Sequence, residues 1–241
     1  MKKTWAGALL LLALLATSCT LTESFDNRTA TGLGPDLSWT RADFPRSTAR
    51  WQTAGNRAIF SATMPNGTYD VQEDLRGPSS GLQTDDQRAS VDIVSHSPAT
   101  GNGHIWVSTL LGVRVQTVTD DYQGYSAEVV RTNYNLWVPD PETAPTLNFT
   151  YWMLILYRSD YGHRYGETML GSVGVSPNLS TPQTFTLEAD GTTISASFAG
   201  QTVTATDATY SDGVPGLYGF LSGNGGDTLE VVVDNFRAED I

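Results

Sequence analysis

The 241-residue chain has a single cysteine, Cys19, and its only lysines are Lys2 and Lys3. One cysteine cannot form an internal disulfide, so a folded domain must be held together by its hydrophobic core. No long run of apolar residues follows the 3.6-residue period of a helix. Beyond residue 3 all positive charge is arginine, and the formal net charge is −12. This balance lacks the basic footprint that nucleic-acid binding requires.

Common catalytic motifs are missing as well. There is no Gly-x-Ser-x-Gly nucleophile motif and no phosphate-binding loop. His96, His104 and His163 do not have the spacing of metal ligands. The sequence therefore identifies no catalytic residue and no catalytic metal centre.

Glycoside hydrolysis needs two carboxyl groups roughly 5–9 Å apart, and a strand of the form Glu-x-Asp-x-x-Glu, which would supply them, is absent. The acidic pairs that do occur are neighbours in the chain: Glu73–Asp74, Asp85–Asp86 and Asp120–Asp121. Adjacent residues of a strand point to opposite faces, so such pairs do not suit a shared site. The last two pairs fall in expected turns, where aspartate binds the local backbone.

The chain is instead rich in Thr, Ser, Gly and Tyr, with alternating apolar residues between turn signals. This pattern is typical of an all-β sandwich or barrel. Strands are expected at residues 57–62, 69–75, 90–95, 105–118, 125–138, 148–157, 184–189, 194–198, 203–205 and 229–236. Asp190-Gly191 is expected to turn one antiparallel hairpin. The length fits one large β domain, residues 25–241, with no repeat or second domain.

The N-terminus has the anatomy of a cleaved signal peptide. Residues 1–18 combine a basic start, an apolar core too short to span a bilayer, and small residues before Cys19. Ala-Thr-Ser-Cys resembles the bacterial lipobox, which implies that Cys19 is lipidated and anchors the protein to a membrane. Residues 19–24 are then the lipidated cysteine and a short tether. In a double-membraned bacterium, Thr20 after the cysteine implies outer-membrane or cell-surface location.

The C-terminal segment, residues 211–240, contains Asp-Gly-x-x-Gly-Leu-x-Gly and then Val-Asp-Asn-Phe. These motifs resemble the end of concanavalin A-like (LamG-like) lectin and glucanase domains, a superfamily that includes 3-keto-disaccharide hydrolase-like proteins. Phe25, Asp26, Arg28 and Trp39 loosely resemble the opening of such domains. The resemblance implies an antiparallel jelly-roll β-sandwich whose last strand pairs near the first. Asp234 is either a strand-end hydrogen-bonding residue or a ligand of a structural calcium ion.

Carbohydrate binding needs aromatic rings that stack on sugars and a few polar groups that read hydroxyls. Residues of these types fall in the middle strands and their loops, the region that forms the concave face in similar folds: Trp106, Trp137, Tyr157, Arg158, His163 and Tyr165. The sequence thus favours a non-catalytic module that binds carbohydrate or envelope glycan. A glycoside hydrolase or polysaccharide lyase remains an alternative. In a lyase, the Tyr/His/Arg set of residues 160–165 could act, with Arg164 neutralising a uronate and a tyrosine or His163 moving the proton. A structural envelope protein that binds another protein is a second alternative.

Overall fold

The computed structural model describes residues 20–25, 40–42, 51–64, 68–76, 85–97, 105–118, 121–134, 146–160, 167–224 and 226–241. Within these ranges no helix is long and apolar enough to cross a membrane. The strands are β1 (Thr20–Glu23), β2 (Thr40–Ala42), β3 (Trp51–Thr53), β4 (Ala58–Thr63), β5 (Thr68–Arg76), β6 (Gln87–His96), β7 (Ile105–Val118), β8 (Asp121–Tyr134), β9 (Thr146–Ser159), β10 (Glu167–Val175), β11 (Gln183–Asp190), β12 (Thr193–Phe198), β13 (Gln201–Thr206), β14 (Val214–Asn224) and β15 (Thr228–Asp240).

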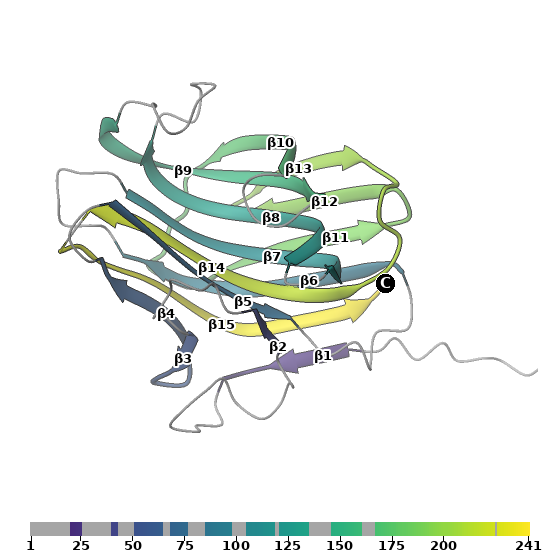
Figure 1. Cartoon of the computed structure of the whole chain (residues 1–241), viewed down its shortest axis with the longest axis horizontal. Helices are drawn as coiled ribbons and strands as arrows, with labels where there is room; N and C mark the ends of the chain where they lie inside the picture. Colours follow the sequence, from purple (N-terminus) through teal and green to yellow (C-terminus); the bar gives the residue numbers. More distant parts are fainter. Residues whose placement is uncertain are drawn as a thin grey trace, which may run out of the picture.

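The strands form two antiparallel sheets packed face to face. One sheet has the order β13-β12-β11-β6-β15-β4-β3, with β1 added beside β15, and the other has the order β10-β9-β8-β7-β14-β5-β2. Figure 1 shows the long strands β9, β8, β7 and β14 side by side in the second sheet. The expected all-β antiparallel sandwich is confirmed.

Alternation along each strand builds the core between the sheets. In β11, Phe185 and Leu187 are fully buried, while Thr184 on the same strand points to solvent. Gly191 has a φ of 55° in the β11–β12 turn, a conformation that glycine adopts without steric cost, as the Asp-Gly signal predicts. Each fully buried Phe or Leu stabilises the fold by about 1.5–3 kcal/mol. The core thus replaces the disulfides that the chain lacks.

The closing strand β15 is central to the eight-stranded sheet. It pairs with β6 and β4, and its end pairs with β1, where Thr20 lies opposite Glu239. The expected return of the last strand to the first is therefore found, and Figure 1 shows β1 beside β15. Residues 20–23, expected as a tether, form a strand instead, because Leu21 packs against the core and Glu23 is buried.

Strand β10 is one of the elements that the sequence did not predict, together with the short strands β1, β2 and β3. Gly171 and Gly174 interrupt its apolar residues, and glycine ordinarily weakens a strand. Its pairing with the edge of β9 holds it in the sheet. A Cβ on Gly171 would lie 2.7 Å from Val203 of β13, so the two sheets come close at this edge. Tertiary packing here outweighs local preference.

A polar cluster lies between the sheets at one end of the core. His96 Nε2 is 2.8 Å from Thr109 Oγ1, and the ring stacks on Trp152 with centroids 5.0 Å apart. Arg131 donates to the backbone oxygen of His96 at 3.2 Å and lies 5.8 Å from the Trp152 ring centroid. Burial, with the positive charge of Arg131, lowers the pKa of His96 to about 3. The imidazole is therefore neutral at physiological pH.

Candidate carbohydrate-binding face

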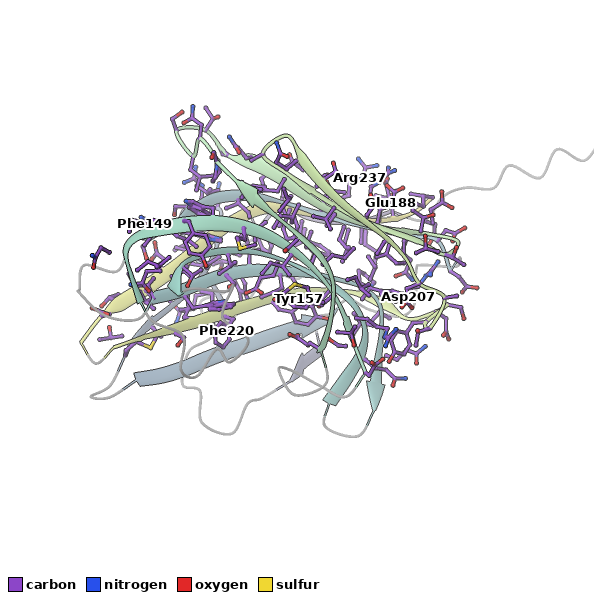
Figure 2. The ribbon with its side chains drawn as sticks, turned by 90° about the horizontal axis from the view of Figure 1, so that it is seen from above. Phe149, Tyr157, Glu188, Asp207, Phe220 and Arg237 are labelled. Carbon is purple, nitrogen blue, oxygen red and sulfur yellow. The ribbon has the colours of Figure 1, made fainter. Side chains whose placement is uncertain are left out.

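The outer surface of the seven-stranded sheet gathers aromatic side chains. In β9, Trp152 and Leu154 pack into the main core, while Met153, Ile155 and Tyr157 belong to a separate outer cluster. We call this surface the aromatic face; its members used below are Trp106, Ser108, Glu128, Tyr151, Tyr157, Tyr218 and Phe220. Figure 2 places Tyr157 and Phe220 on the side of the sandwich opposite Glu188 and Arg237.

Glu128 of β8 lies at the centre of the aromatic face. Its Oε1 accepts hydrogen bonds from Trp106 Nε1, at 2.7 Å, and from the Ser108 hydroxyl. Its Oε2 accepts a hydrogen bond from the Tyr157 hydroxyl at 3.3 Å. The side chain is only 5% exposed. A buried carboxylate needs such donors, and here it holds an indole and a phenol from two neighbouring strands in fixed orientations.

The rings of β14 extend this arrangement. Phe220 meets Trp106 edge to face, with centroids 6.3 Å apart and planes at 90°. Tyr218 lies over two glycines of the sheet, because a Cβ on Gly112 or Gly216 would come within 2.6 or 2.3 Å of its hydroxyl oxygen. Glycine at these positions lets a ring lie flat against the sheet. The half-buried Trp106 therefore sits in a rigid aromatic setting.

Two serines on the same face have unmet hydrogen-bonding capacity. Ser126 pairs across the sheet with Tyr157, and Ser159 follows Tyr157 on the same face of β9. Both side chains are almost completely buried. Within the described part of the chain, neither hydroxyl oxygen has a hydrogen-bond partner. Buried polar groups are usually satisfied, so a bound water molecule is the partner expected for each hydroxyl.

Glu167 of β10 is a second acidic residue on the aromatic face whose side chain is described. It pairs with Ser159, whereas Glu128 pairs with Ile155, four residues earlier in β9. Four residues of a strand span about 13 Å of backbone. Both oxygens of Glu128 already accept hydrogen bonds from protein donors, which fits a role in positioning its neighbours.

Of the residues predicted to bind carbohydrate, only some lie together on the aromatic face. Trp106 and Tyr157 meet through Glu128 on the aromatic face. Arg158 is the next residue of β9, and its guanidinium joins the acidic cluster formed with Asp160 and Asp207. Cys19, Trp137, His163 and Tyr165 lie outside the described residues.

The Arg158 guanidinium is held by ion pairs with two aspartates. It donates to Asp207 Oδ2 at 2.7 Å and to Asp160 Oδ1 at 3.0 Å. Burial alone would raise the pKa of Asp207, but hydrogen bonds from Tyr125, Thr209 and Arg158 outweigh it and hold the pKa well below its usual range. Burial and the hydrogen bond to Asp160 raise the pKa of Tyr210.

These contacts tie the segment after β13 to the end of β9. Arg164 and His163, on which the lyase alternative depends, lie outside the described residues.

Asp234 forms a local hydrogen bond, which is one of the two roles expected for it from the sequence. Its Oδ1 accepts a hydrogen bond from the backbone of Asn235, which has a φ of 51°. The register between β15 and β6 shifts just after Asp234, so the pair marks a β-bulge. Across the described residues, no group of three or more His, Cys, Asp or Glu side chains could hold a metal ion.

Of the three acidic pairs considered in the sequence, the structure describes the side chains of Asp85 and Asp86. Asp86 accepts hydrogen bonds from Arg114 and from the backbone of Gly191, and the Asp85 carbonyl accepts another from Arg114. That pair has the expected turn role. Asp120 lies outside the described residues, as do the side chains of Glu73, Asp74 and Asp121.

Glu128, Ser108, Tyr151, Tyr218 and Phe220 were missed by sequence reasoning. One signal was available for Glu128, because it is an isolated acid in a strand of buried neighbours. A carboxylate at such a position must have hydrogen-bond donors or a functional role. Its partners could not be identified, since Trp106 and Tyr157 come from other strands whose register only the fold sets.

Comparisons with known proteins found relatives by structure alone: no family model and no curated sequence matches the chain. The CBM2 module of Lactobacillus casei BL23 phage J-1 evolved Dit superimposes with a TM-score of 0.57 at 13% identity, covering 92% of this chain and 96% of that one. Bacillus licheniformis β-glucanase gives a TM-score of 0.54 at 15% identity, covering 92% and 98%.

LamA from Z. galactanivorans, in complex with laminaritriose and laminaritetraose, gives a TM-score of 0.55 at 12% identity, covering 93% of this chain and 99% of that one. At such low identity these likenesses concern architecture only. With the two antiparallel sheets and their strand order, they show that the chain has the concanavalin A-like jelly-roll fold.

Proposed function

We propose that the protein binds a carbohydrate chain on the aromatic face without cleaving it. The observation that carries this proposal is the Glu128 network, which orients Trp106 and Tyr157 from neighbouring strands. Aromatic rings stack on the apolar faces of sugars, and fixed polar groups beside them read hydroxyls.

Recognition is favoured over hydrolysis because Glu128 works through its neighbours. Both carboxylate oxygens accept hydrogen bonds from protein donors. Glu128 is therefore a positioning residue for the rings. The solved neighbours include a module named for carbohydrate binding as well as glucanases, and both kinds of protein handle glycans.

The test uses the purified chain on a panel of insoluble and soluble polysaccharides. We expect retention on at least one polysaccharide and no new reducing or unsaturated chain ends. Trp106→Ala should lose retention, while Thr204→Ala, on the opposite sheet, should keep it. New chain ends would overturn the non-catalytic proposal, and no retention on any glycan would overturn carbohydrate binding. An EDTA arm tests the structural calcium ion considered for Asp234, and we expect no effect on retention.

We also propose that Cys19 carries a lipid that anchors the domain at the cell envelope, as its lipobox-like sequence suggests. Strand β1 begins at Thr20, so an anchor on Cys19 would hold the domain directly against the membrane. Cells grown with labelled palmitate should label the wild-type protein and not Cys19→Ser, and the variant should leave the membrane fraction. Equal labelling of both would refute the anchor.

A further inference from the structure

We propose that the sandwich has a second binding site, at the end of the core, where the Arg131 guanidinium pairs with a carboxylate or sulfate group of a ligand. This site is separate from the aromatic face, because Arg131 lies between the two sheets against Trp152. The inference depends on the contacts of Arg131, on its exposure, and on the donors beside it.

Three side chains from two neighbouring strands form the site, which we call the Arg131 site. Arg131 of β8 pairs with Trp152 of β9, and Thr150 lies two residues before Trp152. The Arg131 guanidinium lies 5.8 Å from the centroid of the Trp152 ring, and its Nη2 is 3.4 Å from Thr150 Oγ1. Each of the three residues is partly exposed. Because the backbone of Arg131 lies inside the sheet between β7 and β9, the exposed part of this residue is its side chain.

Among the described side chains, Arg131 has no carboxylate partner. Its terminal nitrogens donate to two neutral oxygens, the backbone oxygen of His96 at 3.2 Å and the hydroxyl oxygen of Thr150. Its Nε is buried, and no hydrogen-bond acceptor lies near it in the described part of the chain. Charges that leave bulk water are ordinarily paired. The positive charge of Arg131 therefore lacks the compensation that the other partly buried arginines have.

The effect of burial on the arginines shows the same contrast. Hydrogen bonds to carboxylates raise the pKa of Arg88 and of Arg158. Burial instead lowers the pKa of Arg131, as expected for a guanidinium whose desolvation is not offset by an anion. The neighbouring His96 is neutral at physiological pH, so the positive charge of the site is that of Arg131.

The available donors suit an anionic oxygen group. Nη1 and Nη2 carry four N–H groups, and the two hydrogen bonds to protein oxygens leave two of these for a ligand. Thr150 accepts from Arg131, so its own hydroxyl proton can be donated to the same anion. Planar guanidinium groups bind carboxylate and sulfate through two-point contacts. Such a group can come from an acidic sugar or from a free inorganic anion.

The test follows NMR spectra of the purified, 15N-labelled chain during titration with glucuronate, sulfate or glucose at constant ionic strength. We expect saturable shifts of the Arg131 Nε–H and of the amides of Thr150 and Trp152 with an anion, and no such shifts with glucose. A response to glucuronate alone would identify an acidic sugar as the ligand, and a response to sulfate alone a free inorganic anion. An equal response to glucose, or shifts confined to other parts of the chain, would overturn the inference.

Substitutions connect the response to its cause. Arg131→Lys keeps the charge and loses the planar fork, so anion affinity should fall at least about fivefold. Thr150→Val removes one donor and should weaken binding about threefold, which provides a second variant if Arg131→Lys does not fold. Arg237→Gln removes a positive charge from the outer surface of the eight-stranded sheet and should leave anion affinity unchanged. Equal losses in Arg131→Lys and Arg237→Gln would contradict the site.

The Arg131 site and the aromatic face can fail independently. Trp106→Ala, which should lose glycan retention, should keep the anion-dependent shifts, because Trp106 is not part of the Arg131 site. Loss of these shifts in Trp106→Ala would contradict a separate site.

Discussion

The two outer surfaces of the sandwich differ in how deeply their polar side chains are buried. Among the side chains described on the seven-stranded sheet, the Glu128 carboxylate is buried and accepts hydrogen bonds from aromatic donors. On the eight-stranded sheet the strands β11, β12 and β13 carry small hydroxyl side chains that are exposed or half-buried: Thr184, Thr186, Ser195, Ser197, Thr202, Thr204 and Thr206. We call this second surface the hydroxyl face.

Charges on the hydroxyl side remain near solvent. Arg88 pairs with Glu188 at 2.6 Å and with Glu239 at 3.1 Å, and Arg88 and Glu188 are 40% and 27% exposed. Such pairs contribute at most about 1 kcal/mol each. A solvated face stays soluble at little cost in stability, whereas burying a carboxylate is costly unless its donors are placed with care. The contrast is the physical reason to assign function to the aromatic face.

The largest difference between the two faces is expected in the stability lost when a carboxylate is removed from each. Glu128→Ala would leave the Trp106 and Tyr157 donors buried without their acceptor, so the free energy of unfolding should fall by about 2–4 kcal/mol. Glu188→Ala should cost less than about 1 kcal/mol, because water replaces its partner. Urea unfolding of both variants measures the difference. Equal losses would contradict the distinction between the faces.

Acid should act on the core that the two sheets share. The unfolded chain protonates His96 near pH 6.5, while the folded protein keeps it neutral down to a pKa of about 3. The unfolded state thus binds more protons in this window, and the free energy of unfolding should fall by about 2 kcal/mol from pH 7 to pH 5.

His96→Gln can keep a contact with Thr109 without titrating, so it should flatten this slope. Unfolding curves at several pH values measure how the free energy of unfolding depends on pH. An unchanged dependence in the variant would refute the role of His96. The low pKa of Asp207 has a separate window: its contribution is lost only in stronger acid, below the ordinary aspartate range.

Binding should depend on one face only. Trp106→Ala removes the ring that Glu128 orients and should weaken glycan retention by about tenfold. Tyr157→Phe keeps the ring and deletes one hydrogen bond, so its effect should be smaller. Affinity electrophoresis with the retained glycan measures both. A larger loss in Tyr157→Phe would mean that the hydroxyl itself contacts the ligand.

The smallest effects are expected on the hydroxyl face. Thr204→Val replaces an exposed hydroxyl by a methyl group of similar shape, and valine favours strands as threonine does. Its free energy of unfolding should stay within about 0.5 kcal/mol of wild type, with unchanged retention. Loss of retention in this variant would place a ligand site on the hydroxyl face and break the comparison.

Much of the fold follows from local sequence signals. Alternation predicted the strands β7 and β11 to β13 nearly as they are found, and Asp190-Gly191 marked its turn. The two-residue period suffices because it fixes which side chains one strand buries. The motif near Asp234 indicated the closing strand and its place near the N-terminal strand. Strand β10 escaped detection because its pairing with β9, not its own residues, keeps it extended.

The sequence alone determined an all-β chain without disulfides, with aromatic residues in its middle strands and little positive charge. Only the tertiary structure decided that Trp106 and Tyr157 share one carboxylate while Arg158 pairs with Asp207. The reason is register: neighbours in one strand, such as Tyr157 and Arg158, point to opposite faces. Partners across strands meet only when the sheet sets their alignment.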